Sequence, residues 1–562
     1  SVYYLLGRFE EATELFKKPV EATRDAVLHS RMIESLVLSG KFNEAEESLA
    51  KLAVTNPPYS TAMLNALIHR TKSEQLLALG DFSGGTEAIN SYRNSLQTAI
   101  EADPNNLTPY FRLCASLLSE FSLTQEKALL EEALQIVDEG EKIGIATEEF
   151  AVIRADVLQA DGQLDRAVDR LVTYVEENPD ANNARQRLVE AYIDLDNLNR
   201  AISTIEEGIE LDPSSSVWYQ RLGFLHSRNS DDLTAAIKAY ISALEHQPSA
   251  SLLHRINILT RTNKELPNRE LLSMAQSDIS KLHPVGSTIE AKALVKLDRK
   301  RDGLIAMEKS WKDYHLAIKN KWIPPLSATN WFVDLYEIFK DNPEEGEQFA
   351  LKLAGGSFSN PQKHGLANYY KLFGGSYIDK ALNIISNTLE SATLSDDLRP
   401  MFLNLKGGYL VEVGRFEESK NVFKQLVDED GSAFVLNNYA YVVGVYLDDP
   451  ENGLKIAKEA VKLAPREPSI IDTVAELYYL TEDYDKAAET LDFLLQFDSS
   501  NVSAMSKIAI LYSEKLGQPE RGLVFAERAR CIAPRSAEVL DALGWSYYQT
   551  NRKAKAEDLI RR

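Results

Sequence analysis

The most regular pattern of hydrophobic and polar positions lies near the end of the chain, in the stretch AEVLDALGWSYYQTNRKAKAEDLI. Apolar or small residues recur there at i, i+3, i+4 and i+7, namely Leu540, Leu543, Gly544 and Tyr547. This spacing places them on one face of an α-helix. Asn551, which tolerates the left-handed backbone of a helix C-cap, follows this face, and the small Ala556 comes five residues later. The pattern predicts two helices joined by a tight turn and packed closely together.

A related pattern recurs along the chain with a period of 34 or 35 residues. The residues that mark the period are Pro179, Pro213, Pro248, Pro465, Ser499 and Pro534. A period in this range is typical of stacked helix pairs, each of which buries its apolar face on its neighbours. The sequence therefore predicts an all-α fold, an α-solenoid of stacked antiparallel helix pairs. A single closed core is not expected for 562 residues, because such cores stop growing at roughly 250–300 residues.

Three further stretches, 182–213, 216–248 and 468–499, carry the same arrangement of large apolar, glycine, tyrosine and alanine positions. The matching residues are Leu188, Tyr192, Ala201, Ile205, Gly208, Leu222, Gly223, Ala236, Tyr240, Ala243, Ile471, Val474, Ala475, Tyr478, Ala487 and Leu491. Together with the final stretch, they resemble the signature of the tetratricopeptide repeat (TPR) family. The resemblance implies a right-handed superhelix of about 15–16 TPR-like units.

The clarity of the repeat varies along the chain and suggests four segments. Residues 1–145 read as N-terminal TPR-like repeats that are partly irregular, and 146–249 as regular repeats. Residues 250–395 read as degenerate helical repeats or a junction, and 396–562 as regular C-terminal repeats. The chain starts and stops inside a repeat, so we expect it to be a fragment of a longer protein.

The irregular segment holds Trp311, Trp322 and Trp331, three of the five tryptophans, and a locally basic stretch at 292–321. One interpretation is that this segment consists of repeats that retain the helix-pair fold without the sequence signature. The other is a specialised bend or docking surface, because exposed aromatic residues with basic neighbours are common in interface hot spots. Solvent exposure of the tryptophans distinguishes the two.

Composition narrows the classes of partner. The formal net charge of −22 argues against nucleic acid and anionic membranes, both of which favour basic surfaces, and it permits basic partners. No apolar run approaches the roughly 20 residues of a membrane span. Both Cys114 and Cys531 lie in apolar stretches of sequence that we expect to be helical. We therefore expect two buried thiols and no disulfide framework. A low cysteine content is compatible with both the cytoplasm and a bacterial envelope, so it does not identify the compartment.

Motifs for catalysis are absent from the sequence. There is no G-x4-G-K-[ST] phosphate loop, no H-E-x-x-H and no G-x-S-x-G. The eight histidines are scattered singly, without the paired spacing of a zinc site. We therefore expect no enzyme activity, no catalytic residues, no metal and no cofactor.

The resemblance also implies where a partner binds, because the first helix of each TPR pair lines the inner, concave wall of the superhelix. Positions carried over in this way would face that groove. Together with two tryptophans of the irregular segment, the candidate partner-binding residues are Glu190, Asp194, Gln220, Phe224, Arg228, Asp472, Glu476, Tyr479, Asp541, Trp545, Tyr548, Gln549, Trp322 and Trp331. The groove lacks the Lys, Arg and Asn pattern with which some relatives clamp a C-terminal carboxylate. An extended or helical segment of basic character is the expected ligand.

Three functions fit these observations. The first is a non-enzymatic scaffold that binds segments of other proteins. The second is an envelope-associated component of bacterial exopolysaccharide export or outer-membrane assembly, since residues 435–479 and the text LDALGWSYY resemble the C-terminal repeats of bacterial TPR proteins. The third is the regulatory arm of a larger enzyme. The sequence does not set the oligomeric state.

Overall fold

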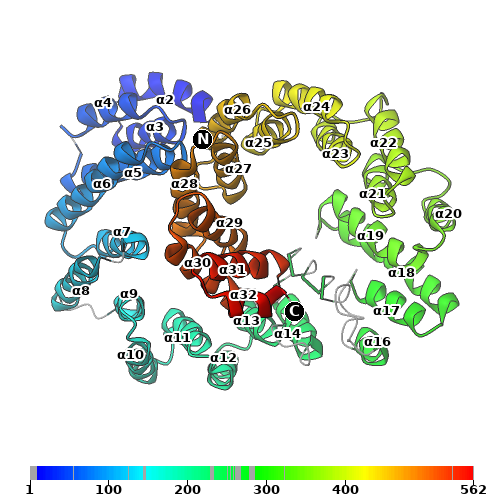
Figure 1. Cartoon of the computed structure of the whole chain (residues 1–562), viewed down its shortest axis with the longest axis horizontal. Coiled ribbons are helices and arrows are strands. Elements are labelled where there is room, and N and C mark those ends of the chain that lie inside the picture. The colour runs from blue at the N-terminus through cyan, green and yellow to red at the C-terminus, as the bar shows by residue number, and fades with distance from the viewer. Residues whose placement is uncertain are drawn as a thin grey trace. The chain divides into compact units, whose positions relative to one another are not determined.

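The computed structural model describes residues 9–560, apart from 24, 55, 125, 144–146, 228–232, 248, 250, 253–254, 257, 260–267, 278–284, 322 and 534–535. Within these residues every regular element is a helix, and consecutive helices pack against each other in pairs (Figure 1). This confirms the predicted all-α fold of stacked helix pairs.

The chain forms two compact units. The first combines residues 1–163 with residues 416–562, and the second comprises residues 164–415. The four-segment division expected from the sequence uses different boundaries and stays a prediction.

The first unit contains two groups of helices. The N-terminal group consists of α2 (Phe9–Thr23), α3 (Ala26–Leu38), α4 (Phe42–Leu52), α5 (Pro58–Ala78), α6 (Phe82–Ala102), α7 (Thr108–Thr124), α8 (Lys127–Lys142) and α9 (Glu148–Ala160). The C-terminal group consists of α24 (Phe416–Glu429), α25 (Ala433–Tyr441), the π-helical turn η4 (Val442–Tyr446), α26 (Pro450–Leu463), α27 (Pro468–Leu480), α28 (Tyr484–Phe497), α29 (Val502–Glu514), α30 (Pro519–Ile532), α31 (Ala537–Gln549) and α32 (Lys553–Ile560).

The second unit continues the same arrangement. Its described helices are α10 (Leu164–Glu177), α11 (Asn182–Asp194), α12 (Leu198–Leu211), α13 (Ser216–Ser227), α14 (Leu233–His246), α16 (Asn268–Ser277), α17 (Val285–Lys296), α18 (Lys300–Lys319), the 3-10 turn η3 (Pro325–Ser327), α19 (Ala328–Phe339), α20 (Pro343–Leu353), α21 (Asn360–Lys371), α22 (Ser376–Leu389) and α23 (Arg399–Glu412).

The turn inside each pair has the backbone that the signature predicts. Asn551, between α31 and α32, has φ 59°, and Gly162 between α9 and α10 has φ 77°. The alanine that follows the turn is buried, with exposures of 4% for Ala556 and 1% for Ala487. Both features confirm the helix–turn–helix unit. The markers Pro248 and Pro534 lie outside the described residues.

Helix pairing persists through the described part of residues 285–395, where the signature is weak. Trp311 and Trp331 are buried there, with ring centroids 4.6 Å apart. Lys292, which the sequence places in the basic stretch, is also internal and forms an ion pair with the buried Asp334 at 3.2 Å. An aromatic cluster and a buried ion pair are thus part of the core in this region, beside buried small residues such as Ala306 and Ala367.

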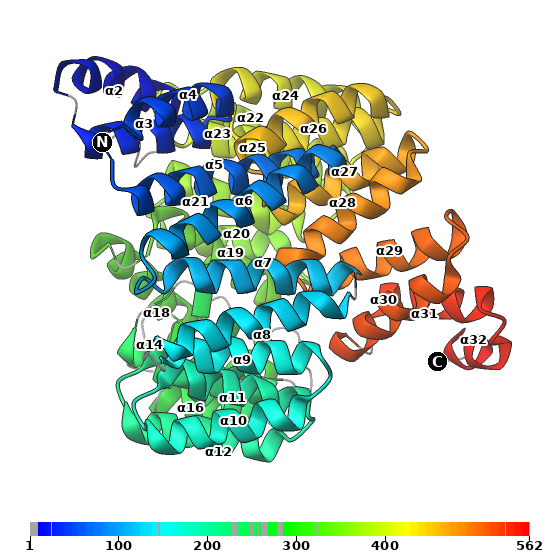
Figure 2. The ribbon, with the colours of Figure 1, turned by 90° about the vertical axis from the view of Figure 1, so that its left-hand side faces the viewer.

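In the first unit, helices that are far apart in the sequence contact each other. α5 packs against α28 and α26, and α7 against α28 (Figure 2). The Tyr478 hydroxyl on α27 donates a hydrogen bond to the Leu79 carbonyl at 2.8 Å, across 399 residues of sequence. Leu77 and Ala78 share one hydrophobic cluster with Tyr478. The N-terminal and C-terminal repeats therefore form one body through a joint core.

Gly80 makes this contact possible. Its φ of 80° is left-handed, and a Cβ at this position would lie 2.6 Å from the Tyr478 hydroxyl oxygen. A side chain there would be strained by its backbone and would collide with the tyrosine.

The two cysteines have different environments. Cys114 is fully buried, and burial raises the pKa of its thiol to about 12. Cys531 is exposed near the end of α30, so the expectation of two buried thiols is wrong for Cys531. The adjacent Ile532 is exposed as well, so the apolar sequence at this end of α30 is not all packed into the core. Across the described residues, no helix combines the length with the apolar character that a bilayer span requires.

Candidate functional site

The clearest exposed surface among the expected partner-binding positions lies on α31. This helix packs against α29, α30 and α32. The residues left exposed include Asp541, Trp545, Tyr548 and Gln549, at i, i+4, i+7 and i+8. Trp545 is 38% exposed and Tyr548 is 53% exposed, and their rings stack with centroids 5.7 Å apart. The α31 stripe, as we call these four residues, is a preformed aromatic platform with one carboxylate beside it.

The acidic positions on α27 have a different environment. Lys507 on α29 contacts both oxygens of Asp472 at 2.9 Å and the Glu476 carboxylate at 3.3 Å. Burial lowers the pKa of Lys507, but the two carboxylates outweigh this effect and the net pKa is raised. Tyr479 lies beside Tyr484, with ring centroids 5.5 Å apart. One cation therefore neutralises part of the negative charge predicted for this part of the groove from within the chain.

The second unit shows the same neutralisation. Glu190 on α11 forms an ion pair with Arg221 on α13 at 3.1 Å. Asp194 is exposed on α11, and Gln220 donates a hydrogen bond to the Ser216 hydroxyl at 3.0 Å. Phe224 is 48% exposed, which leaves one aromatic side chain on this surface.

The docking interpretation of the irregular segment required exposed tryptophans. Trp331 is fully buried on α19, and its indole N–H donates to the Met307 carbonyl at 3.3 Å. The proposal of Trp331 as a surface contact is therefore wrong, because its ring belongs to the core. Trp322 and Arg228 lie outside the described residues.

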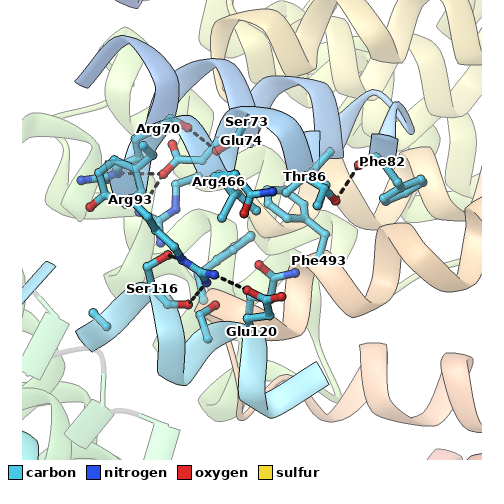
Figure 3. Close-up of a pocket in the computed structure, with 18 of the residues that line it drawn as sticks. Arg70, Ser73, Glu74, Phe82, Thr86, Arg93, Ser116, Glu120, Arg466 and Phe493 are labelled. Carbon is cyan, nitrogen blue, oxygen red and sulfur yellow. Dashed lines mark hydrogen bonds and ion pairs between the residues drawn. The ribbon is translucent and has the colours of Figure 1, made fainter. Parts of the chain in front are cut away.

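A cleft of about 520 Å³ opens inside the first unit, at the contact between the N-terminal and C-terminal repeats. One wall comes from α5, α6 and α7, and the other from α28 and the loop before α27 (Figure 3). The apolar lining residues are Leu77, Phe82, Ile89, Phe493 and Phe497. The sequence analysis did not anticipate this cleft.

Four arginines line the cleft, in a chain whose net charge is −22: Arg70, Arg93, Arg112 and Arg466. Arg93 is fully engaged, because it donates to Ser116 and forms an ion pair with Glu120 at 2.5 Å. This set of bonds ties α6 to α7. Arg93 therefore holds the wall together.

Two of the other three arginines share a single carboxylate. Glu74 contacts Arg70 at 2.9 Å and Arg466 at 3.6 Å (Figure 3). No ion pair of Arg112 is present among the described residues. Burial raises the pKa of the Tyr92 phenol, and the guanidiniums of all three arginines act against that rise in pKa. These groups therefore gather around one phenol with an excess of positive charge.

The part of the opposite wall that α28 forms is acidic. Asp492 on α28 is 8% exposed, and one of its oxygens accepts hydrogen bonds from the Tyr512 hydroxyl at 2.9 Å and from Arg521 at 3.1 Å. Its other oxygen, Oδ1, is buried and has no hydrogen-bond partner among the described residues. Burial raises the pKa of the Asp492 carboxyl. The exposed Glu489 lies one turn away on the same helix.

Sequence reasoning could have found the neutralising bases and could not have found the cleft. Lys507 follows Asp472 by 35 residues, which is one repeat. Comparison of equivalent positions on successive first helices could therefore have predicted this ion pair. The arginine cluster joins residues from opposite ends of the chain. No local pattern reports such a contact.

Comparisons with known proteins agree with the repeat assignment. The sequence model of the tetratricopeptide repeat family matches residues 158–222. No curated protein matches the chain. A crystal structure of MamA is similar over 28% of this chain and 90% of its own, with 14% identity and a TM-score of 0.25. The structure of Naa15/Naa10 bound to HypK-THB is similar over 100% of this chain and 91% of its own, with 11% identity and a TM-score of 0.45. The family match coincides with the consecutively packed helices α10 to α13, so the stretch 158–222 contains tetratricopeptide repeats.

Proposed function

We propose that the protein is a non-enzymatic scaffold that binds segments of other proteins on the exposed faces of its first helices. The observation that carries the proposal is the α31 stripe, where two large aromatic rings stack in solvent. Tryptophan and tyrosine dominate binding energies at protein interfaces, and a stacked pair has already lost much of its side-chain freedom.

The chemistry of the stripe favours a segment of basic character. Asp541 offers a carboxylate beside the faces of Trp545 and Tyr548, and aromatic faces attract guanidinium and ammonium groups. The chain's net charge of −22 adds long-range attraction for such a partner. Since Asp472, Glu476 and Glu190 already have internal partners, we place the binding on α31 ahead of the other candidate positions.

Binding of a labelled peptide tests this proposal. A short fluorescent peptide of alternating arginine and leucine should bind the full chain, and a glutamine and leucine peptide should bind less tightly. The double variant Trp545→Ala, Tyr548→Ala should weaken binding of the basic peptide by about tenfold or more, since truncation of a hot-spot residue costs about 2 kcal/mol or more.

Val524→Ala is the matched control, because Val524 is 58% exposed on the neighbouring α30 and lies outside the stripe. Equal affinity of the wild type and the double variant for the basic peptide would refute the role of α31. The envelope and regulatory-arm alternatives use the same surface and differ in which protein supplies the segment. The proposal includes a bacterial origin for the protein and a location in either the cytoplasm or the bacterial envelope.

A further inference from the structure

The cleft between α5–α7 and α28 has features of a binding site that the scaffold proposal does not use. We infer that it binds a short acidic peptide segment, with a carboxylate on the arginine wall, an apolar side chain on the phenylalanines and a backbone N–H at Asp492. This site is independent of the α31 stripe, in both its residues and the charge of its ligand.

Three arginines, two from α5 and α7 and one from the loop before α27, form what we call the arginine wall, and they set the charge of the ligand. The guanidiniums of Arg70 and Arg466 share the Glu74 carboxylate, and that of Arg112 has no ion pair among the described residues. Arg112 is half-buried, so its charge is costly to leave without a partner of opposite sign. A carboxylate is the natural partner, because a guanidinium can hold it through two parallel hydrogen bonds.

The apolar residues on the floor of the cleft indicate that the ligand also has an apolar side chain. Phe493 and Phe497 come from α28, and Phe82 and Ile89 come from α6. The Arg466 guanidinium lies over the Phe497 ring at 5.3 Å, which brings the charged and apolar parts together. A side chain such as phenylalanine or leucine next to the carboxylate fits this combination.

The acidic residues on α28 favour a peptide over a bare anion as the ligand of the cleft. Asp492 Oδ1 is buried without a hydrogen-bond partner among the described residues, and leaving such an oxygen unsatisfied costs free energy. A peptide supplies a backbone N–H for it. Inorganic phosphate or a nucleic acid carries negative charge on every side and would be repelled by Asp492 and Glu489. The cleft therefore favours a peptide whose charge is confined to its side chains.

Fluorescence anisotropy with defined peptides tests the inference. The probe is a short, labelled, N-acetylated peptide of alternating glutamate and phenylalanine, and its counterpart has glutamine in place of glutamate. The full chain should bind the glutamate peptide at least about tenfold more tightly than the glutamine peptide, since charge-assisted hydrogen bonds are about twice as strong as neutral ones. Arg112→Gln should remove most of that preference.

Arg552→Gln is the control for a general loss of positive charge, because Arg552 is exposed in the turn before α32 and does not line the cleft. A second variant, Arg466→Gln, should also weaken binding, and since Arg466 is 46% exposed in a loop this change leaves the fold intact. Circular dichroism melting verifies that each variant is folded.

The outcomes are distinct from those of the α31 experiment. Equal binding of the glutamate and glutamine peptides overturns the inference, as does an affinity that neither Arg112→Gln nor Arg466→Gln changes. Displacement of the labelled peptide by inorganic phosphate at equal concentration also overturns it, because the site would then be a simple anion site. Binding that is lost in Trp545→Ala, Tyr548→Ala and kept in Arg112→Gln assigns the peptide to α31 and overturns the cleft as its site.

Discussion

The hydrogen bond from Tyr478 to Leu79 gives a direct test of the joint core between the N-terminal and C-terminal repeats. Burial raises the pKa of this phenol to about 12, so the hydroxyl stays protonated and donates throughout the physiological range. Tyr478→Phe removes the oxygen and leaves the ring in place. A neutral hydrogen bond contributes about 1 kcal/mol net, so local opening of this contact should become about fivefold more frequent.

Hydrogen exchange of the backbone amides at residues 76–81 measures that opening, because these amides close the end of α5 beside Tyr478. The matched control is Tyr547→Phe. Tyr547 occupies the equivalent signature position in the last repeat, and its hydroxyl bonds Glu527 at 3.3 Å within the C-terminal repeats. The control should leave exchange at residues 76–81 unchanged.

Adding Gly80→Ala converts the test into a double-mutant cycle. In the wild type the substitution incurs a left-handed backbone cost of about 1–2 kcal/mol and a collision with the Tyr478 oxygen 2.6 Å away. In the Tyr478→Phe background the nearest remaining atom is the ring carbon Cζ at 3.1 Å, so the collision is relieved and the backbone cost stays. The two changes should therefore be less destabilising together than the sum of their separate effects, by about 1 kcal/mol. Strict additivity, or unchanged exchange in Tyr478→Phe, would refute the geometry.

Three other predictions address separate features. Lys507→Gln leaves two neighbouring carboxylates on α27 without their shared cation and should lower the free energy of unfolding by up to about 1 kcal/mol, as measured by chemical denaturation. Burial lowers the pKa of His364 below its ordinary value of 6.5, so the unfolded chain takes up the proton first as the pH falls; the stability that neutral His364 contributes is present above pH 6.5 and declines below it toward the depressed pKa, and His364→Gln should flatten the melting temperature over that range. In the folded chain a thiol reagent should modify Cys531 rapidly and Cys114 only on unfolding; rapid modification of both would contradict the burial of Cys114.

Most of the fold could be predicted from the sequence, because in a repeat protein most contacts are local. The turn at Asn551 and the buried Ala487 follow from the backbone and size requirements of a helix pair that each repeat must satisfy by itself. Exposure of Trp545 could be predicted for the same reason, since its position on the helix is set by the residues that face the next repeat. Trp331 could not be assigned, because the repeat signature is weak in the irregular segment and does not mark which face of the helix is buried.

The charges of the groove were harder to predict, since a charged side chain has no preferred partner in a single sequence. Asp472 and Glu476 read as open acidic positions until Lys507, one repeat later, is placed beside them. An ion pair between successive first helices stabilises the stack and reduces the surface available to a partner. The repeat spacing contains this information, provided that equivalent positions are compared as pairs instead of one at a time.

The contact around Tyr478 shows why a repeat signature does not determine what each repeat does. Tyr478 and Tyr547 are the same signature residue, but one bonds a helix end 399 residues away and the other bonds within the C-terminal repeats. The distant bond depends on Gly80, which serves the left-handed turn of its own repeat and also leaves room for the Tyr478 hydroxyl. The cleft is built from the same joint core, with Arg112 on one wall and Asp492 on the other. A peptide that contacts both walls binds only when the N-terminal and C-terminal repeats are in contact. Its binding must therefore stabilise that contact, by the difference between its binding free energies for the joined and the separated repeats. Binding of the glutamate peptide should therefore slow exchange at residues 76–81, and Tyr478→Phe should weaken that binding although its hydroxyl lies outside the cleft.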